Sequence, residues 1–286
     1  RLAATRRVGH AGTLDPLATG LLVVGVGRGT RLLTYLSGLD KSYQATIRLG
    51  WSTLTDDAEG SAITFAAPEL MAGLSEPAVT AAVSQLTGPL QQVPSTYSAI
   101  KIGGVRAYAA ARAGQTPQLA ARPVVVHSFA VLDSCRHQVD QHTVLDLEVT
   151  VTVSSGTYVR ALARDLGAAL GVGGHLTKLR RSSVGPFNLS EASQLDALAN
   201  RWQMLGLAQA ARRVLPTCRL TANQVTAWQY GQKIAVDIAA AFGEPLGDKP
   251  DQPTVVAVLD PAEQLAGIGH LHKDGQLKPV AVFPAN

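Results

Sequence analysis

The sequence predicts an α+β fold, with a largely antiparallel mixed sheet flanked by helices and a small β-rich module at the C-terminus. Residues 41–50 and 144–153 alternate apolar and polar side chains, as half-buried strands do. Residues 159–170 repeat apolar side chains at the spacing of a helix. From about residue 219 the chain turns to loops rich in glycine and proline and to short apolar strands. Strands in hairpin-like succession, with helices between them, favour an antiparallel sheet.

The first half of the chain supplies one clear strand and one clear helix. The strand 41–50, KSYQATIRLG, has an apolar face formed by Tyr43, Ala45, Ile47 and Leu49. The helix is expected over 75–88, because Ser75 is a good capping residue, Pro77 suits a first turn, and Gly88 ends the pattern. Residues 93–114 read as an extended piece, a Gly-Gly turn and a short helix.

The second half repeats the pattern. Residues 123–133 predict a strand, and 144–153 predict another. Ser154 to Thr157 break the alternation, and a helix follows, ended by glycines. Its apolar face comprises Val159, Leu162, Ala163, Leu166 and Leu170.

Composition sets wide limits on function. The 286 residues are 46% hydrophobic and 16% charged, enough for a large core in one or two domains. A net charge of +4 permits a nucleic-acid partner without requiring one. Cys135 and Cys218 lack a second ligand at metal spacing, so we expect reduced thiols, no metal and a cytoplasmic protein. The apolar run 17–27 is too short to span a membrane, and we expect no membrane partner.

The segment RRVGHAGTLDPLATGLLVVGVG, residues 6–27, places an acid at the start of an apolar run. Asp15 before Pro16 is a common way to begin a turn, and in isolation that interpretation is favoured. An aspartyl-phosphate nucleophile is a weak alternative, because Pro-Leu-Ala follows the acid and offers no magnesium ligand. We expect the apolar run itself to form a strand of the sheet.

Five blocks of sequence resemble, in order, the TruB family of tRNA pseudouridine synthases. They are VGHAGTLDPLATGLLVVGVGRGT, DKSYQATIRLGWSTLTDDAEG, QVPSTYSAIKIGGVRAYAAARAG, SSGTYVRALARDLG and LTKLRRSSVGPF. The resemblance covers roughly residues 5–190 and implies a pseudouridine-synthase fold. It also implies that Asp15 is the catalytic aspartate, that Arg160 pairs with this carboxylate, and that Tyr43 stacks on the target base.

The resemblance further implies a set of RNA contacts. The residues concerned are His10, Leu179, Tyr158, Lys101, Arg106, Arg112, Arg180 and Arg181. Three of them fall in a thumb-like insertion at about 93–122, which we expect to close on the RNA through phosphate contacts. Taken alone, each cation reads as part of a solvated surface.

The implied domains are a catalytic domain over 1–218 and a PUA-like RNA-binding domain over 219–286. Family members carry an upstream Lys-Pro-x-Gly-x-Thr-Ser-type motif that is absent here. Because the chain also begins with Arg1, we expect that an N-terminal segment is missing.

The implied activity is isomerisation of uridine 55 in the tRNA T-loop, and we expect a monomer without an obligate protein partner. Moving the base from N1 to C5 changes no oxidation state and loses no atom, so we expect no cofactor. The target base must be flipped out of its stack, and an aromatic side chain can receive it. Two alternatives stay open: an RNA-binding or tRNA-folding protein without turnover, and a synthase that works in a guide-RNA complex.

Overall fold

The computed structural model describes residues 2–97, 101–102, 105–106, 119–238 and 253–283. The chain forms two compact units, each built from more than one segment. The sheet unit comprises residues 12–22 and 37–192. The C-terminal unit comprises residues 1–11, 23–36 and 193–286. These limits do not coincide with the expected domain boundary at 218/219, because two N-terminal segments and residues 193–218 group with the C-terminal module.

The sheet unit is built on a seven-stranded mixed sheet among the residues that the structure describes, in the order β13–β12–β4–β11–β10–β7. All of these neighbours are antiparallel, and only the short β2 pairs in parallel, with β12. The strands are β2 (Thr19–Gly20), β4 (Lys41–Leu49), β7 (Gly88–Gln92), β10 (Arg122–Val139), β11 (His142–Val153), β12 (Gly174–Val184) and β13 (Phe187–Asn188). The predicted strands 41–50, 123–133 and 144–153 correspond to β4, β10 and β11.

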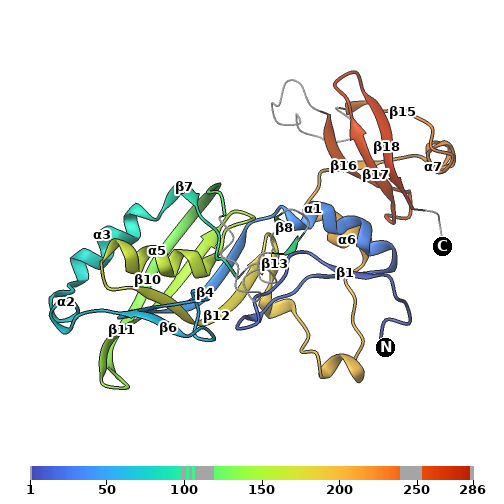
Figure 1. The fold of residues 1–286 in the computed structure, drawn as a ribbon. Coiled ribbons are helices and arrows are strands. Elements are labelled where there is room, and N and C mark those ends of the chain that lie inside the picture. The colour runs from blue at the N-terminus through green and yellow to red at the C-terminus, as the bar shows by residue number, and fades with distance from the viewer. Residues whose placement is uncertain (1, 98–100, 103–104, 107–118, 239–252, 284–286) are drawn as a thin grey trace. The chain divides into compact units, whose positions relative to one another are not determined.

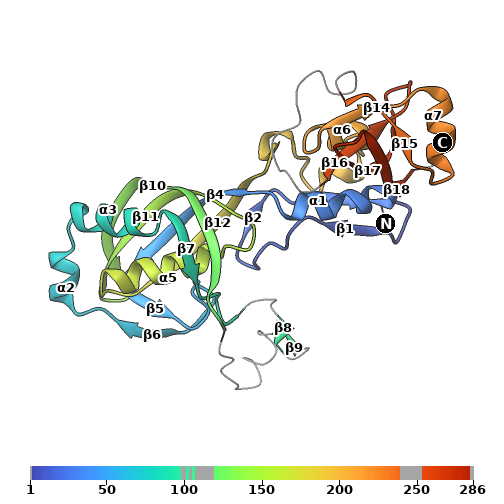
Figure 2. The ribbon, with the colours of Figure 1, turned by 90° about the horizontal axis from the view of Figure 1, so that it is seen from above.

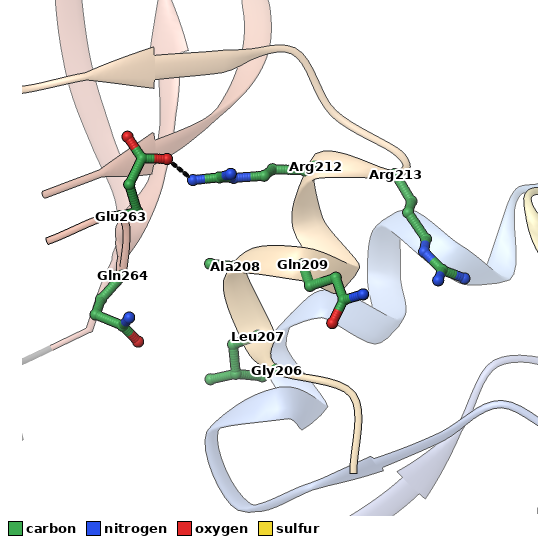
Figure 3. Close-up of a pocket in the computed structure, with 8 residues that line it drawn as sticks. All are labelled: Gly206, Leu207, Ala208, Gln209, Arg212, Arg213, Glu263 and Gln264. Atoms are coloured by element: carbon green, nitrogen blue, oxygen red, sulfur yellow. Dashed lines mark hydrogen bonds and ion pairs between the residues drawn. The ribbon is translucent and has the colours of Figure 1, made fainter.

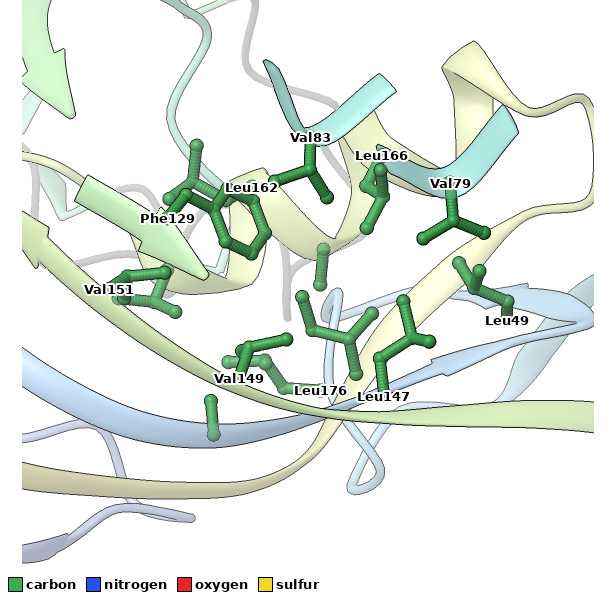
Figure 4. Close-up of a cluster of buried hydrophobic side chains, with 14 of the residues drawn as sticks. Leu49, Val79, Val83, Phe129, Leu147, Val149, Val151, Leu162, Leu166 and Leu176 are labelled. Atoms are coloured by element: carbon green, nitrogen blue, oxygen red, sulfur yellow. The ribbon is translucent and has the colours of Figure 1, made fainter. Parts of the chain in front are cut away.

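Helices α3 (Glu76–Gln85) and α5 (Val159–Ala169) cover one face of this sheet (Figures 1 and 2). Their apolar faces pack on the inward side chains of the central strands (Figure 4). Leu162 and Leu166 of α5 are fully buried there, as the helical spacing predicts. The Ser75 hydroxyl accepts a hydrogen bond from the Ala78 amide, which confirms the predicted cap of α3.

The smaller elements complete the sheet unit. Helix α2 (Pro68–Gly73) precedes α3, and β5 (Trp51–Thr53) pairs with β6 (Ala62–Phe65). Within the segment 93–122, β8 (Lys101–Ile102) pairs with β9 (Val105–Arg106). A short 3₁₀ turn, η2 (Leu189–Glu191), follows β13.

The prediction that the apolar run 17–27 forms a strand of the sheet is wrong. The run is divided between β2 and β3 (Val24–Val26), and among the described residues β3 pairs only with β1 (Val8–His10). Gly20, the last residue of β2, lies at φ +100°, and the pairing with β12 ends there. Leu22 and Val24 are exposed to solvent, so the hydrophobicity of the run does not mark a buried strand.

The C-terminal unit contains a five-stranded sheet among its described residues, in the order β14–β16–β17–β18–β15. The strands are β14 (Thr217–Arg219), β15 (Ile234–Ala235), β16 (Thr254–Leu259), β17 (Leu265–Leu271) and β18 (Gln276–Val282). The other elements are η1 (Gly27–Leu32), α1 (Leu33–Ser37), η3 (Ala197–Ala199), α6 (Leu207–Arg212) and α7 (Ala222–Gln229). Trp228 of α7 is fully buried, and its Nε1 donates to the Ala266 carbonyl at 3.1 Å. The predicted small β-rich module at the C-terminus is therefore confirmed.

Candidate active site

Asp15 begins a turn within the segment 12–22 of the sheet unit. The Ala18 amide donates to the Asp15 carbonyl at 2.9 Å, and Pro16 occupies the second position, where its fixed φ suits a turn. The turn interpretation made from sequence is therefore correct for the backbone of Asp15. Its side chain is 28% exposed, so solvent reaches part of the carboxylate.

Arg160 holds that carboxylate. Its Nε lies 3.1 Å from Oδ2 of Asp15, and its Nη2 lies 3.0 Å from Oδ1. This paired geometry is the strongest form of an arginine–carboxylate contact. Arg160 lies in the first turn of α5, after Gly156 at φ +90°, and its side chain is only 4% exposed. The structure thus brings together the two residues that the family resemblance pairs.

The other donors of Arg160 are also used. Nη1 donates to the Thr55 carbonyl at 2.9 Å and lies 3.4 Å from Oδ2 of Asp57. Nη2 also donates to the Tyr97 carbonyl at 2.9 Å. A buried guanidinium is tolerated only when it is fully hydrogen-bonded. Arg160 is therefore fixed in one orientation and shares its charge between the carboxylates of Asp15 and Asp57.

Asp57 was missed by the sequence analysis. It is 2% exposed, and one carboxylate oxygen accepts hydrogen bonds from the Thr55 hydroxyl and the Glu59 amide. The signal in the sequence was the Asp56–Asp57 pair within the second of the five blocks that resemble the family. An acidic pair is usually solvated, so its burial could not be foreseen.

Tyr43 lies on β4, with its ring packed against the main core. Burial raises the pKa of its phenol, the nearby charge of Arg181 lowers it, and the charge of Asp15 raises it. The phenol is therefore neutral at pH 7, and the Asp15 carboxylate is close enough to affect it. Asp15, Arg160 and Tyr43 all belong to the sheet unit.

The expected RNA-contacting residues lie in different surroundings. Leu179 is buried in the core beside Ala45 of β4, so it can line a pocket only as part of its wall. Tyr158 precedes α5 and is half-buried, with its amide donating to Oε1 of Gln92 at 2.8 Å. Arg180 is exposed, and its Nη1 lies 3.4 Å from the Thr19 hydroxyl.

Arg181 does not fit the expected phosphate contact. It is 1% exposed, and its guanidinium donates to the carbonyls of Leu21 and Gly12. Adjacent residues of a strand point to opposite faces, so the exposure of Arg180 and the burial of Arg181 follow from the pleat. Sequence reasoning treated both as surface cations because arginine is rarely buried.

The other residues expected to contact RNA lie in the C-terminal unit or in the segment 93–122. His10 is an exposed residue at the end of β1 in the C-terminal unit. Lys101 and Arg106 pair with each other through β8 and β9, and Arg112 lies outside the described residues.

The C-terminal unit contains a separate pocket of about 430 Å³ (Figure 3). It is lined by Gly206, Leu207, Ala208, Gln209, Arg212, Arg213, Glu263 and Gln264. Arg212 forms an ion pair with Glu263, which also accepts a hydrogen bond from Nε of Arg219 at 2.7 Å.

None of the helices in the described part of the chain has the length and hydrophobicity that crossing a membrane requires.

Solved structures share the overall fold. One is titled "Structure of H/ACA RNP bound to a substrate RNA containing 2'-deoxyuridine" (TM-score 0.67, 20% identity, 99% of this chain and 78% of that chain). Another is titled "Crystal Structure of a Cbf5-Nop10-Gar1 Complex" (TM-score 0.66, 22% identity, 100% of this chain and 77% of that chain). At 20% and 22% identity, these two structures show a shared fold.

Comparisons of the sequence identify the family to which the chain belongs. A protein of Arthrobacter sp. (strain FB24), named "tRNA pseudouridine synthase B", is 50% identical over 292 residues, which cover 100% of this chain and 90% of that protein. A protein of the same name from Thermobifida fusca (strain YX) is 46% identical over 283 residues, which cover 99% of this chain and 91% of that protein. The family models described as "TruB family pseudouridylate synthase (N terminal domain)" and "tRNA pseudouridylate synthase B C-terminal domain" match residues 1–159 and 160–218. The chain belongs to the TruB family of pseudouridylate synthases and is an enzyme of the isomerase class.

Proposed function

We propose that this enzyme converts uridine 55 in the T-loop of tRNA to pseudouridine, with Asp15 as the reacting carboxylate and without a cofactor. The observation that carries the proposal is the paired contact of Asp15 with the buried Arg160. The names of the relatives support tRNA as the substrate. The isomerisation breaks the N1–C1′ bond, forms a C5–C1′ bond, and transfers a proton from C5 to N1 overall.

The geometry supports a specific division of labour. Arg160 keeps the carboxylate of Asp15 oriented, and a preorganised charge is worth most where water is excluded. The carboxylate keeps enough exposure to meet a substrate. Tyr43 offers a neutral ring beside it, which suits stacking of a flipped uracil.

Base flipping follows from access. A uridine stacked in a loop hides C1′ and C5, and unstacking it costs a few kcal/mol. Stacking on an aromatic ring restores roughly 1–3 kcal/mol. Tyr43 is therefore proposed as the platform, with Leu179 as part of the pocket wall. The exposed Arg180 is proposed to bind RNA phosphate, and the same proposal covers His10, Lys101, Arg106 and Arg112.

The decisive experiment is conversion of a synthetic T-arm stem-loop by the unchanged chain and by Asp15→Asn, without any other protein. We expect the unchanged chain to convert the loop uridine. Asp15→Asn should bind the RNA within about 3-fold of the unchanged chain and convert it at least ~10³-fold more slowly, as loss of a reacting group does. Conversion by the variant at the unchanged rate would exclude Asp15 as the reacting group.

The same experiment separates the alternatives. If the chain is an RNA-binding or tRNA-folding protein, both the unchanged chain and Asp15→Asn would bind the stem-loop, and neither would convert its uridine. A synthase that depends on a guide-RNA complex would also leave the bare hairpin unmodified. Conversion of the hairpin by this chain alone excludes both.

A further inference from the structure

Arg181 is a buried cation that the proposed reaction does not use directly. It lies on β12, is 1% exposed, and is aligned with Tyr43 of β4. Burial of an unpaired guanidinium is strongly unfavourable, so its donors must find fixed acceptors. The identity of those acceptors shows what Arg181 holds in place.

Both described acceptors belong to the loop that carries Asp15. Nε of Arg181 donates to the Leu21 carbonyl at 2.7 Å, and Nη2 donates to the Gly12 carbonyl at 3.1 Å. The backbone carbonyl of Arg181 accepts a further hydrogen bond from the Leu21 amide at 2.8 Å. Gly12 and Leu21 lie on either side of Asp15 in the sequence. One side chain therefore bridges the two ends of the loop 12–22.

The same guanidinium lies beside the Tyr43 phenol, whose pKa it lowers against the effect of burial. The register between β12 and β4 shifts directly after Arg181. Such irregularities change the direction of a side chain and are common near active sites. The side chain is thus directed beneath the loop rather than toward solvent.

We propose that Arg181 is a positioning residue, which clamps the loop 12–22 at Gly12 and Leu21 and so fixes the Asp15 carboxylate relative to the Tyr43 ring. This role rests on the proposed function, because it matters only if Asp15 reacts with a base held against Tyr43. Arg181 does not contact RNA phosphate. The exposed Arg180 is the cation of this pair that remains available for RNA.

Arg181→Gln and Arg181→Lys test the clamp. Glutamine keeps a donor but cannot reach both carbonyls, and lysine keeps the charge but loses the planar fork. The matched control is Arg48→Gln, which removes the ion pair with Asp146 at 2.7 Å on the same sheet. Arg48 lies five residues along β4 from Tyr43, about 17 Å at ~3.4 Å per residue.

Three quantities are measured for each variant. They are the single-turnover rate with the T-arm stem-loop at saturating enzyme, the dissociation constant for that RNA, and hydrogen exchange of a peptide covering residues 12–22. We expect Arg181→Gln to slow the rate at least ~30-fold, to keep the dissociation constant within about 3-fold, and to accelerate exchange of the loop. The rate and loop exchange of Arg181→Lys should lie between those of Arg181→Gln and those of the unchanged chain. Arg48→Gln should keep both quantities near those of the unchanged chain.

Two results would overturn the proposal. The first is a rate for Arg181→Gln equal to that of Arg48→Gln, with unchanged loop exchange. The second is weakened RNA binding with a shallower salt dependence and an unchanged saturating rate, which would make Arg181 a phosphate contact. Failure of the unchanged chain to convert RNA would instead refute the proposed function, and loop exchange would still test the clamp. If Arg181→Gln does not fold, the lysine variant supplies the same comparison.

Discussion

The guanidinium of Arg160 holds the carboxylate of Asp15 through two hydrogen bonds, although 145 residues separate them in the chain. The contact joins a turn that begins with Asp-Pro to the first turn of α5. The same guanidinium lies 3.4 Å from the buried carboxylate of Asp57. Arg160 therefore connects three segments of the sheet unit, and its removal should affect both stability and reaction rate.

Replacement of Arg160 by lysine should lower the single-turnover rate at least ~100-fold. Lysine keeps the positive charge, but it cannot make the paired contact with Asp15 while donating to the Thr55 and Tyr97 carbonyls. Unfolding by urea should also require about 2–4 kcal/mol less, because buried partners are left unsatisfied. A variant that retains the full rate would show that orientation of Asp15 by Arg160 is not needed.

Replacement of the exposed Arg180 by alanine should weaken RNA binding without changing the rate at saturation. Loss of one phosphate contact lowers the slope of log affinity against log salt by roughly 0.7–0.9. The measurement is a salt titration of stem-loop affinity, and Arg48→Gln serves as a control for the loss of an arginine. An unchanged slope would remove Arg180 from the RNA surface.

The elements with the clearest periodicity were predictable from sequence. The spacing of Val159, Leu162 and Leu166 predicted α5, because one face of the helix must pack against the sheet. The alternation in 41–50 predicted β4 for the corresponding reason at a period of two. The expectation that Asp15 pairs with Arg160 came from the family resemblance rather than from periodicity.

The features that the sequence did not predict depend on contacts between residues far apart in the chain, which a local sequence pattern does not reveal. The apolar run 17–27 lacks the expected strand because Gly20 and the pairing of β3 with β1 divide it. The burial of Asp57 depends on a bridge to Leu176, and that of Arg181 depends on the loop 12–22 folding over it. Because charged residues are mostly exposed in folded proteins, a sequence alone favours a solvent-exposed position for each of them.

Acid should destabilise the protein partly through His175, which is 2% exposed. Its Nδ1 donates to the Trp51 carbonyl at 3.1 Å, since a carbonyl can only accept. Burial is the main cause that lowers its pKa from 6.5; the charge of Arg48 adds to this, and the Trp51 carbonyl, Asp146 and Asp57 oppose it. The unfolded chain therefore takes up this proton first, and stability falls as the pH drops below about 6.5 toward the folded-state pKa.

The measurement compares urea unfolding midpoints at pH 7 and pH 5. In His175→Gln, the amide can still donate to Trp51 but does not titrate, so its midpoint should fall less than that of the unchanged chain. His127→Gln, at an exposed histidine, controls for loss of an imidazole. Equal falls in the unchanged chain and in His175→Gln would assign the acid sensitivity to other groups.

Gly20→Ala should displace the loop that carries Asp15. Gly20 lies at φ +100°, and a Cβ there would collide with the Arg181 carbonyl oxygen and lie 2.8 Å from the Arg181 amide nitrogen. The backbone strain alone costs about 1–3 kcal/mol, and the contact is with backbone that cannot swing away. Relief of the clash requires separation of β2 from β12, which also pulls Leu21 from Arg181.

The matched control for this prediction is Gly27→Ala, because Gly27 lies at φ +57° with no atom within 4 Å of its ideal Cβ. Both substitutions carry the cost of a left-handed backbone, and only Gly20→Ala adds the collision with β12. We expect Gly27→Ala to keep its single-turnover rate within about 3-fold and Gly20→Ala to lose at least ~10-fold. Equal rates in the two variants would show that the approach of β2 to β12 does not set the position of Asp15.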